Sequence, residues 1–562
     1  MPSLPPLPIK RLKQVVETLY DFGFEIWVGR LKLKYVVPLH KRYMRLVRKD
    51  VVPCPLEEYY GGKVQDVPRR FRLVLEHLGG AYVKLGQMMS LRADIVGERI
   101  AQELRQLQDR VPSVPYADIK AAIEDEFDRP LSSVFSRFEQ KPVGAASLAQ
   151  VHKAILKDGT PVAVKVLRPG IEKAIRDDML LLRYLAELAE RHIEFTRRFH
   201  PIDFVNEFIE WTNKELDLVH EAINTEHFRS LYADSANLFI PRVYWDFTTK
   251  RILTMEFSNG IHLDDFKGYR KMKSSRKAIA DIGMEIAFRQ FFEVGYFHGD
   301  PHPGNFFVMS NNTLCLHDFG IVGRISDDMR KELIAFYINF LEKDGEAAAT
   351  HLLRMAQTDE RSDREGFIRS ALDEFESWFY APKKGARISN SLYRVVISGV
   401  RHGVRFPSSI ALLAKSIVTM ESMALLLDPS FNITQRLRPY LTELMKIQLK
   451  PEVIAKKGRE FLTDSFQILE QLPEAAQKLI ALARKGEMPV RLDIEDFERI
   501  RNEIDRQSDI RILSLVLIAI LITTAIMLHI QGVSTILGIP FSTIGIIASI
   551  VLGVQLILRI KN

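Results

Sequence analysis

The sequence is poor in cysteine, and this limits the classes of protein to which it can belong. Only Cys54 and Cys315 occur among its 562 residues. Two cysteines so far apart provide neither a disulfide framework nor a cysteine-rich zinc site, and they fit a reducing compartment. Apolar residues are not scarce. With 47% hydrophobic and 27% charged residues the chain has a globular composition, and its length allows about two to four domains.

Charge is missing from a long stretch near the C-terminus. Between Arg511 and Arg559 there is no Asp, Glu, Lys or Arg. We expect two membrane-spanning helices here, Ile512–Ile530 and about Phe541–Leu558, because each approaches the length that crosses a bilayer. Positive residues flank the pair on one side only, so both ends are expected on the cytoplasmic side. The alternative is a buried helical hairpin of a soluble protein.

The N-terminus lacks the pattern of a signal peptide, in which an apolar core precedes a cleavage site. The excess of positive charge is confined to the first fifty residues, with eleven Lys or Arg against four Asp or Glu. Apolar residues such as Phe22, Phe24 and Trp27 lie among them, as in a helix that rests on an anionic membrane. The alternative is a solvated helical extension packed on the rest of the protein.

The stretch His298–Gly320 carries the most specific chemical pattern. Asp300 and Asn305 lie five residues apart, two β-prone runs follow, and Asp318 comes after the second run in the tripeptide Asp-Phe-Gly. Phosphoryl transfer needs Mg²⁺ held against the phosphates and a carboxylate that orients or deprotonates the acceptor. We assign the carboxylate role to Asp300 and the metal to Asn305 and Asp318, because hard oxygen ligands suit Mg²⁺. The alternative is a polar loop whose side chains only form turns.

Glycine is scarce where a phosphate-covering loop is expected. The segment Pro142–His152 has a single glycine, Gly144, and carries alanine at 145, 146 and 149, which predicts a stiffer loop than a glycine-rich one. The turn signal Asp158-Gly159 then leads to a strand that ends in Lys165, which we expect to reach the nucleotide phosphates. A later segment, Met255–Ser258, is expected to hold adenine as a hinge. The residues predicted at the nucleotide are Gly144, Ala145, Ala146, Ser147, Val151, Lys165, Glu256 and Ser258.

A carboxylate is required to hold Lys165 in place. Two helical stretches follow the lysine, about Ile171–Phe199 and about Asp203–Tyr232. The second one carries three candidate site carboxylates, of which Glu215 is the first choice as the partner of Lys165 and Glu221 the second. The third is Asp217. The alternative for any one of them is a solvated acidic face. A β-hairpin, Ile240–Phe247 with Arg251–Phe257, is expected next.

Together these motifs resemble the UbiB/aarF/ADCK family of atypical, protein-kinase-like proteins. The resemblance covers roughly residues 65–430 and includes a helical motif, Lys84-Leu-Gly-Gln87, whose Lys84 and Gln87 share one helix face. It implies nucleotide (ATP or ADP) with Mg²⁺, a role in ubiquinone or related quinone biosynthesis, and ATPase rather than conventional protein-kinase activity. It also implies that Lys84 and Gln87 lie over the active site and gate it. Gly144 departs from the family pattern, where alanine is common.

The resemblance implies an α+β fold of two kinase-like lobes with a helical N-terminal extension and a C-terminal transmembrane hairpin. After Gly320 the chain reaches a helix start at Ser326-Asp327-Asp328, so no peptide-binding activation loop is expected. The predicted divisions are a basic segment 1–64, a helical extension 65–130, an N-lobe 131–260, a C-lobe 261–430, an amphipathic juxtamembrane region 431–510 and two membrane helices 511–562.

Three functions fit these observations. The first is a membrane-anchored kinase or ATPase of quinone-lipid metabolism, in a bacterial inner membrane rather than an organellar one. The second is a small-molecule phosphotransferase of the choline or aminoglycoside type, which shares the Asp–Asn loop. The third is an idle scaffold that uses nucleotide to hold a membrane complex together. The expected partners are membrane lipids, quinone-precursor lipids and other quinone-biosynthesis proteins, with no nucleic acid.

Overall fold

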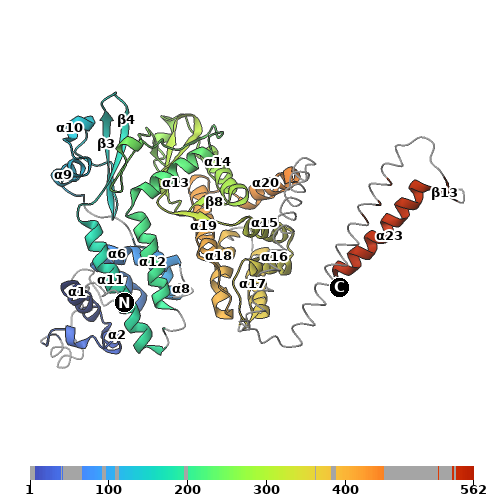
Figure 1. The fold of residues 1–562 in the computed structure, drawn as a ribbon, viewed down its shortest axis with the longest axis horizontal. Coiled ribbons are helices and arrows are strands. Elements are labelled where there is room, and N and C mark those ends of the chain that lie inside the picture. The colour runs from blue at the N-terminus through green and yellow to red at the C-terminus, as the bar shows by residue number, and fades with distance from the viewer. Residues whose placement is uncertain are drawn as a thin grey trace, which may run out of the picture. The chain divides into compact units, whose positions relative to one another are not determined.

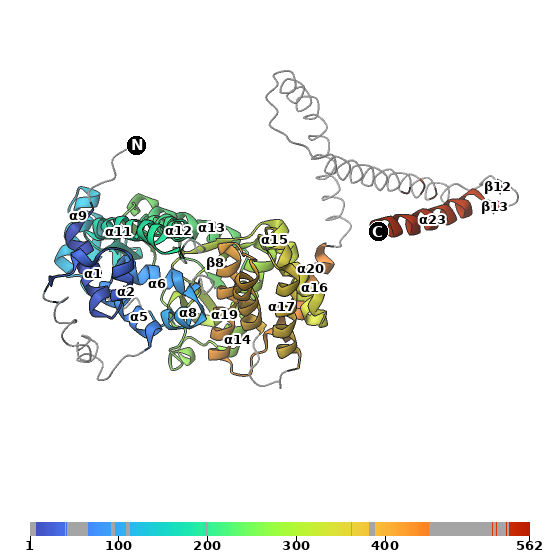
Figure 2. The same ribbon diagram turned by 90° about the horizontal axis from the view of Figure 1, so that it is seen from below.

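The protein is described by a computed structural model over residues 7–39, 41, 66–91, 96–107, 113–194, 196, 200–360, 362–380 and 388–448, and over 517, 520, 524, 535–536 and 539–561. These residues fall into two units, Met1–Ile447 and Gln448–Asn562. Figures 1 and 2 show the elements of the first unit from two sides. Helix α20 (Ile433–Gln448) occupies the start of the predicted juxtamembrane region, and the rest of that region, from residue 449 on, lies outside the described residues, as does most of the first predicted membrane span.

The N-terminal extension is helical, as predicted. Its buried side chains form one apolar cluster with the first helices of the next lobe. Gly79, with a φ of 64°, ends one helix and lets the chain turn into the helix that carries Lys84. The helices are α1 (Ile9–Asp21), α2 (Glu25–Arg30), α5 (Val67–Leu78), α6 (Ala81–Leu91) and α8 (Glu98–Leu104).

A five-stranded sheet forms the predicted N-lobe, in the order β1-β3-β4-β6 with β2 paired to β3. The predicted hairpin turn at Asp158-Gly159 joins β3 to β4, and Gly159 has a φ of 90°. The predicted hairpin of Ile240–Phe247 with Arg251–Phe257 is confirmed only in part: the second segment contains β6, but in the first only Val243 forms a bridge, antiparallel to Met255, and a 3₁₀ turn follows. The elements are α9 (Tyr116–Phe127), α10 (Leu131–Val134), β1 (Phe135–Phe138), β2 (Gly144–Ala145), β3 (Ala149–Leu156), β4 (Pro161–Leu167) and β6 (Ile252–Glu256).

Three helices, not the predicted two, follow β4. They are α11 (Ile171–His192), α12 (Pro201–Glu215) and α13 (Leu218–Leu231). The second predicted stretch breaks at Leu216-Asp217, where the Asp217 side chain accepts a hydrogen bond from the Val219 amide and caps α13. Glu215 and Glu221 therefore belong to different helices, and helical periodicity does not relate their directions.

The C-lobe combines small sheets with a helical body. One sheet has the order β5-β10-β9-β7, and β11 pairs with β8. The predicted hairpin after Asn305 is confirmed as β9 and β10. The strands are β5 (Leu238–Phe239), β7 (Ile261–His262), β8 (Tyr296–His298), β9 (Phe306–Met309), β10 (Thr313–Leu316) and β11 (Val322–Arg324). The helices are α14 (Arg276–Phe288), α15 (Asp327–Glu342), α16 (Gly345–Arg354), α17 (Arg364–Phe379), α18 (Ile388–Ser398), α19 (Ser408–Leu427) and α20 (Ile433–Gln448).

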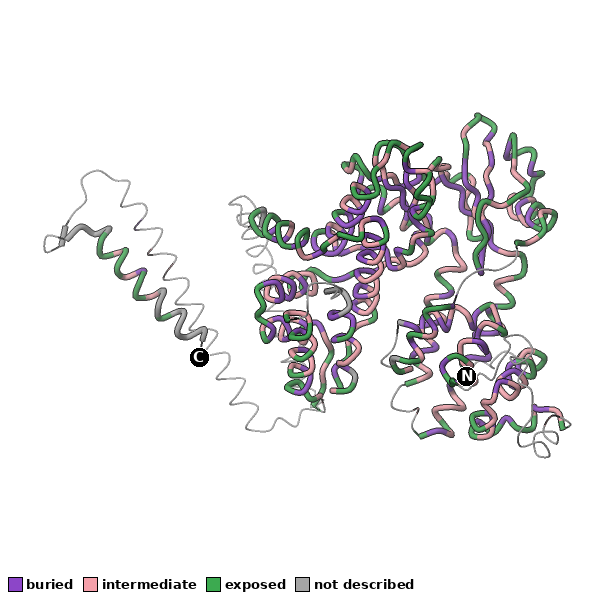
Figure 3. The backbone as a smooth tube through the Cα atoms, turned by 180° about the vertical axis from the view of Figure 1, so that it is seen from behind, coloured by how far each residue is buried: buried purple, intermediate pink, exposed green. Residues whose placement is uncertain are grey.

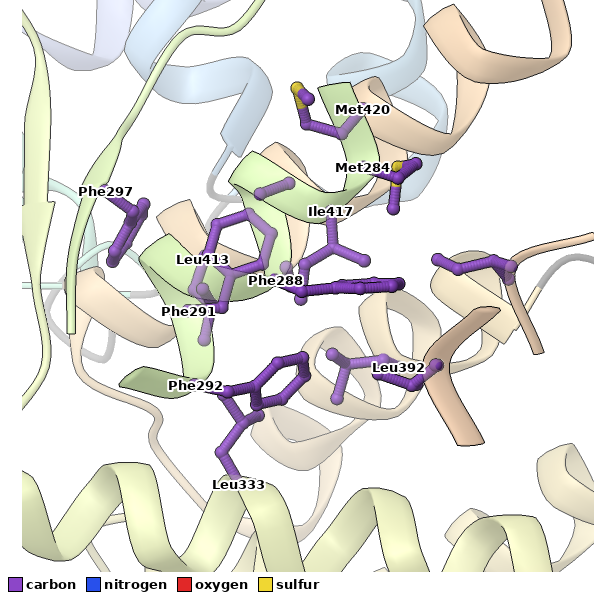
Figure 4. Close-up of a cluster of buried hydrophobic side chains, with 14 of the residues drawn as sticks. Met284, Phe288, Phe291, Phe292, Phe297, Leu333, Leu392, Leu413, Ile417 and Met420 are labelled. Carbon is purple, nitrogen blue, oxygen red and sulfur yellow. The ribbon is translucent and has the colours of Figure 1, made fainter. Parts of the chain in front are cut away.

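The core of the C-lobe lies between α14 and α19. Helix α14 runs into a π-helical turn, Arg289–Val294, and Figure 4 shows Phe288, Phe291 and Phe292 from this region beside Leu413 and Ile417 of α19. Aromatic side chains of this size supply most of the apolar area that a core buries. This packing fixes the two elements that reach the catalytic loop.

Within its described residues, the second unit contains a strand pair and one long apolar helix. The elements are β12 (Thr535–Ile536), β13 (Ile539–Pro540) and α23 (Phe541–Lys561). The side chains of Ile544, Ile547 and Ile550 in α23 are exposed, and much of the helix is green in Figure 3. Among described residues, only α19 meets the length and hydropathy of a membrane span, and 56% of its apolar window is buried, as in a soluble core helix. A shorter apolar stretch, Thr543–Leu552, lies in α23.

Candidate active site

Hydrogen bonds to neighbouring elements hold the catalytic loop in place. His298 ends β8, and its backbone amide donates to the side-chain oxygen of Gln290 in the π-helical turn at 2.9 Å. The His298 Nδ1 accepts from the Asp300 amide at 3.1 Å, and Nε2 donates to the His317 carbonyl at 3.2 Å. Burial lowers the pKa of His298, so the ring is neutral and both nitrogens keep these roles. The Asn305 Nδ2 donates to the Asp300 carbonyl at 3.1 Å, which joins the two ends of the loop.

Asp318 reaches the site through strained backbone. Its φ of 56° lies in the left-handed region, which a residue with a side chain adopts at a cost. The next residue, Phe319, is buried against Phe228 of α13, and its carbonyl accepts from the Asn224 side chain at 2.9 Å. These contacts hold the Asp-Phe-Gly turn in place and direct the Asp318 carboxylate toward Lys165.

Lys165 pairs with Glu221, which corrects the first choice of Glu215. The Lys165 Nζ lies 2.7 Å from both carboxylate oxygens of Glu221 and 3.5 Å from Oδ2 of Asp318. Burial alone would lower the pKa of Lys165, but Asp318 and Glu221 raise it, so the lysine keeps its charge. Desolvation likewise opposes charge on Asp318, yet Lys165 lowers the pKa of that carboxyl below its ordinary value.

Glu215 instead binds Lys84. Its Oε2 lies 2.5 Å from the Lys84 Nζ, and its other carboxylate oxygen is buried without a hydrogen-bond partner among the described residues. The helix of Lys84, α6, contacts α11, α12 and α19. Gln87 lies about one turn further along α6 and is half-buried. Asp217, the third predicted carboxylate, caps α13 and does not pair with Lys165.

The alanine-rich loop is a tight turn that other elements pin down. Gly144 and Ala145 pair with β3, and the Ala146 amide donates to the Ala149 carbonyl at 2.8 Å. The Arg168 Nε donates to the Ala146 carbonyl at 2.9 Å. At the tip, the Ser147 hydroxyl is buried and has no hydrogen-bond partner within the described part of the chain. A phosphate oxygen would satisfy it.

The hinge segment and the strand before Asp318 touch each other. The predicted nucleotide-binding residue Ser258 has its hydroxyl 2.8 Å from the His317 Nε2, and Cys315 Sγ lies 3.2 Å from the same nitrogen. Burial lowers the pKa of His317 to about 4, so this ring is neutral. Glu256 ends β6, and Val151 lies opposite Lys165 across β3 and β4. The contact between His317 and the hinge segment was not predicted from the sequence.

The donors present fit Mg²⁺ shared with a nucleotide. No group of three His, Cys, Asp or Glu side chains forms a self-contained metal site within the described ranges. Mg²⁺ in nucleotide sites commonly takes one or two protein oxygens and completes its shell with phosphates and water. Asn305 and Asp318 are the two residues that would hold it, and the orphaned Ser147 hydroxyl marks a place for an acceptor oxygen.

A further residue at the site, Lys415, was missed. Its Nζ lies 2.8 Å from Oδ1 of Asp300 and comes from α19, far along the chain. Desolvation opposes charge on Asp300, but Lys415 lowers the pKa of the carboxyl below its ordinary value. A lone lysine in an apolar helix is a signal that could have identified it, because a buried helix rarely carries an ammonium without a partner.

Comparison with known proteins identifies the family. The family model described as the ABC1 atypical kinase-like domain matches residues 106–352, the UbiB helical domain matches 374–432, and the ABC1/UbiB kinase-like C-terminal domain matches 495–561. A protein of Marinobacter nauticus named "Probable protein kinase UbiB" is 34% identical over 412 residues, which cover 73% of this chain and 75% of the relative. The chain belongs to the UbiB family.

Other UbiB relatives agree. A protein of the same name from Pseudomonas aeruginosa is 34% identical over 416 residues, covering 73% of this chain and 76% of its own. The Pseudomonas fluorescens protein is 32% identical over 424 residues, which cover 75% of this chain and 78% of the relative. Among solved structures, a complex of Rv3197 with erythromycin from Mycobacterium tuberculosis has a TM-score of 0.42 at 23% identity, covering 63% of this chain and 90% of that one, too loose a likeness to bear on function. UbiB family membership confirms the predicted kinase-like fold.

Proposed function

We propose that this UbiB protein is a membrane-anchored atypical kinase or ATPase that binds Mg-nucleotide and supports ubiquinone or related quinone biosynthesis. The observation that carries the proposal is the ion-pair chain at the site. Lys165 is fixed between Glu221 and Asp318, and Asp300 and Asn305 are joined in the adjoining loop. A polar loop that only forms turns would not require a buried lysine between two carboxylates from separate elements.

Each residue has a role in phosphoryl transfer. Asp318 and Asn305 would hold Mg²⁺, which supplies charge neutralisation for the phosphates. Lys165 binds phosphate oxygens, and the Ser147 hydroxyl donates to another. Asp300 orients the acceptor hydroxyl or water rather than removing its proton early, because the ion pair with Lys415 makes it a weak base.

Closure of the site by α6 favours a small acceptor over a peptide. The Lys84–Glu215 pair ties this helix to α12, and α6 also contacts α19 of the other lobe. After Gly320 the chain forms β11 and starts α15 at Asp327 with Ser326 as its cap, so no peptide platform lies between them. A lipid phenol or water is the acceptor that this arrangement suits.

The choline or aminoglycoside type of phosphotransferase is the second candidate. This type shares the Asp–Asn loop, but a function of this type does not explain helix α6 or its Lys84–Glu215 ion pair. The third candidate, a nucleotide-dependent scaffold for other quinone-biosynthesis proteins, leaves the poised Asp300 without a task. Lipid analysis of a deletion strain separates the first from the second: accumulation of a quinone precursor supports the first, and normal quinone content argues against it.

A membrane anchor near the C-terminus is part of the proposal. Helix α23 presents exposed isoleucines in its first half. Thr524, from the first predicted span, lies so close to Gly545 that a Cβ on this glycine would stand 2.1 Å from the Thr524 hydroxyl oxygen, as expected for two closely packed membrane helices. The anchor would be multi-pass in a bacterial inner membrane, with the catalytic part cytoplasmic and quinone-precursor lipids at hand.

Truncation tests the anchor. Deleting the chain from Arg511 onward should release the protein from membranes, or leave only salt-sensitive binding through the basic N-terminal segment. Extraction with high salt and with carbonate measures this. A truncated protein that resists both treatments would place the anchor elsewhere.

The metal assignment is tested by Asp318→Asn. This variant should lose Mg-dependent ATP binding while its melting temperature stays near that of the wild type. Asp328→Asn is a matched control, because Asp328 lies on the surface in a pair with Lys331. Isothermal titration with ATP, with and without Mg²⁺, makes the comparison. Unchanged Mg-ATP affinity in Asp318→Asn would remove Asp318 from the metal site.

A further inference from the structure

Helix α19 touches the catalytic loop at two consecutive residues. The Ser416 hydroxyl oxygen lies 3.1 Å from the His298 carbonyl oxygen, 3.3 Å from that of Gly299 and 2.9 Å from that of Leu412 in its own helix, so its one proton is shared among these acceptors. The preceding residue, Lys415, places its Nζ 2.8 Å from Oδ1 of Asp300. Because α19 is packed along most of its length in the C-lobe core, these contacts tie the loop to a rigid element.

The catalytic loop supplies no lysine or arginine of its own beside Asp300. The residues between Asp300 and Asn305 are Pro301, His302, Pro303 and Gly304. His302 is exposed, and its Nε2 lies 3.9 Å from Oδ2 of Asp300, beyond hydrogen-bond distance. Lys415 is therefore the cation that makes a direct hydrogen bond to the Asp300 side chain.

The other two lysines of the site are already engaged. Lys165 is held by Glu221 and Asp318, and Lys84 by Glu215. Each of these two lysines is paired with other carboxylates, so the three lysines of the site have different partners. The side chains of Lys415 and Asp300 are 30% and 32% exposed, which leaves the pair accessible to a bound substrate.

We propose that Lys415 is a positioning residue for phosphoryl transfer, which fixes the Asp300 carboxylate in the direction from which it receives the acceptor. The inference rests on the proposed function. With Oδ1 held by the ammonium, Oδ2 is the oxygen turned to the acceptor. Transfer needs the reacting oxygen aligned with the phosphorus to within a fraction of an ångström, and a carboxylate free to rotate would meet that alignment rarely.

A purely structural role predicts a different outcome. A lysine–aspartate pair that is about one third exposed contributes little to stability, and in a purely structural role its loss would leave turnover unchanged. A positioning role predicts a lower kcat with little change in nucleotide binding, because Asp300 acts on the acceptor and not on the nucleotide. The split between kcat and KM therefore separates the two.

The experiment compares Mg-ATP hydrolysis by the full-length protein and its variants in lipid vesicles. Lys415→Met should lower kcat roughly tenfold or more, while KM and the Mg-ATP dissociation constant stay within about threefold. Lys415→Arg should recover most of the rate, because the guanidinium can also bind a carboxylate oxygen. Lys331→Met is the control, since Lys331 forms a pair of the same 2.8 Å length with Asp328 on the protein surface.

Lys415→Gln serves as a second neutral variant in case the methionine variant folds poorly. A neutral variant with wild-type melting temperature and wild-type kcat overturns the inference and leaves the proposed function intact. Equal loss of rate in Lys415→Arg and Lys415→Met, with weakened Mg-ATP binding in both, also overturns it, because it indicates a general distortion. A wild-type protein that neither binds nor hydrolyses Mg-ATP overturns the proposed function, and this inference with it.

Discussion

Replacing Glu221 with glutamine tests which carboxylate holds Lys165. In the wild type the lysine ammonium lies 2.7 Å from both oxygens of Glu221, and the Glu221 side chain is only 6% exposed. The Glu221→Gln variant keeps the shape and one acceptor oxygen but removes the charge. Lys165 would then be drawn toward Asp318, its remaining partner at 3.5 Å.

The size of the effect follows from this geometry. Removing one member of a buried ion pair costs about 3–5 kcal/mol when the other charge is left alone. Because Asp318 and the amide oxygen remain, we expect about 2 kcal/mol of lost stability, the range of a charge-assisted hydrogen bond. A loss of ~1 kcal/mol lowers Tm by about 2–4 °C in a domain of 150–250 residues, so a drop of a few degrees is expected in this larger unit.

Nucleotide binding should suffer more specifically. Lys165 drawn onto Asp318 would compete with Mg²⁺ for that carboxylate, and the Mg-ATP dissociation constant should rise roughly tenfold, equivalent to ~1.4 kcal/mol. Differential scanning fluorimetry and calorimetric titration measure both effects. Glu172→Gln is the matched control, because Glu172 pairs with Arg251 on the surface. If Glu215→Gln weakens Mg-ATP binding in this way and Glu221→Gln does not, the pairing described here is refuted.

Three further predictions use other parts of the site and the lobe around it. His152 is buried, its Nδ1 is hydrogen-bonded to a backbone carbonyl, and burial lowers its pKa. The unfolded chain therefore binds a proton that the folded protein does not, so the stability of the folded protein should fall as pH drops below about 6.5. Melting curves should show a less steep fall in the His152→Gln variant. Gly144→Ala should leave Tm unchanged because the added Cβ would meet no atom within 4 Å. Gly295→Ala should lower the free energy of unfolding by roughly 1–2 kcal/mol, because Gly295 has a φ of 69° and the added Cβ would lie 3.0 Å from the Ile325 carbonyl oxygen. Equal melting temperatures for the two variants would contradict this. Lys84→Ala and Ala146→Gly should increase autophosphorylation and reduce complementation of quinone synthesis, and normal behaviour in both assays would mean that neither residue gates the site.

The catalytic motifs could be predicted because they are local. The Asp300–Asn305 loop, the β9–β10 hairpin and the turn at Asp318 lie within one short stretch, and their spacing already determines how the loop, strands and turn follow each other. Capping at Ser326 was predictable for the same reason, since a cap depends on residues three positions apart. Local chemistry of this kind is visible without any knowledge of the fold.

The partner of Lys165 could not be predicted because it depends on a helix break. The sequence predicted one helix over Asp203–Tyr232, in which the helical repeat would set the directions of Glu215 and Glu221 relative to each other. The Asp217 cap starts a new helix instead, so Glu221 turns to Lys165 while Glu215, at the end of α12, turns to Lys84. Asp217 itself was predicted as a site carboxylate, although its side chain is occupied by the cap.

Contacts between distant segments were missed for a different reason. Lys415 meets Asp300 across 115 residues, and Ser258 meets His317 across 59. Lys415 is the single charged residue between Arg405 and Glu421, in a stretch that reads as an apolar core helix. A lone charged residue in an apolar helix indicates a buried partner, but only the packing of α19 against the catalytic loop shows that the partner of Lys415 is Asp300.

The charges gathered at the site explain why metal and nucleotide should bind together. Lys84, Lys165 and Lys415 are paired with Glu215, Glu221 and Asp300, and Asp318 adds one carboxylate more than there are lysines. An uncompensated carboxylate here would repel a bare polyphosphate, whereas a divalent cation held by Asp318 and Asn305 would reverse the local sign. Lys165 is the lysine paired with Asp318, and if Asp318 held Mg²⁺ as proposed, Lys165 would be free to turn toward the phosphates. On the proposed function, replacing the ammonium by the metal at Asp318 would therefore couple metal binding to nucleotide binding through Lys165.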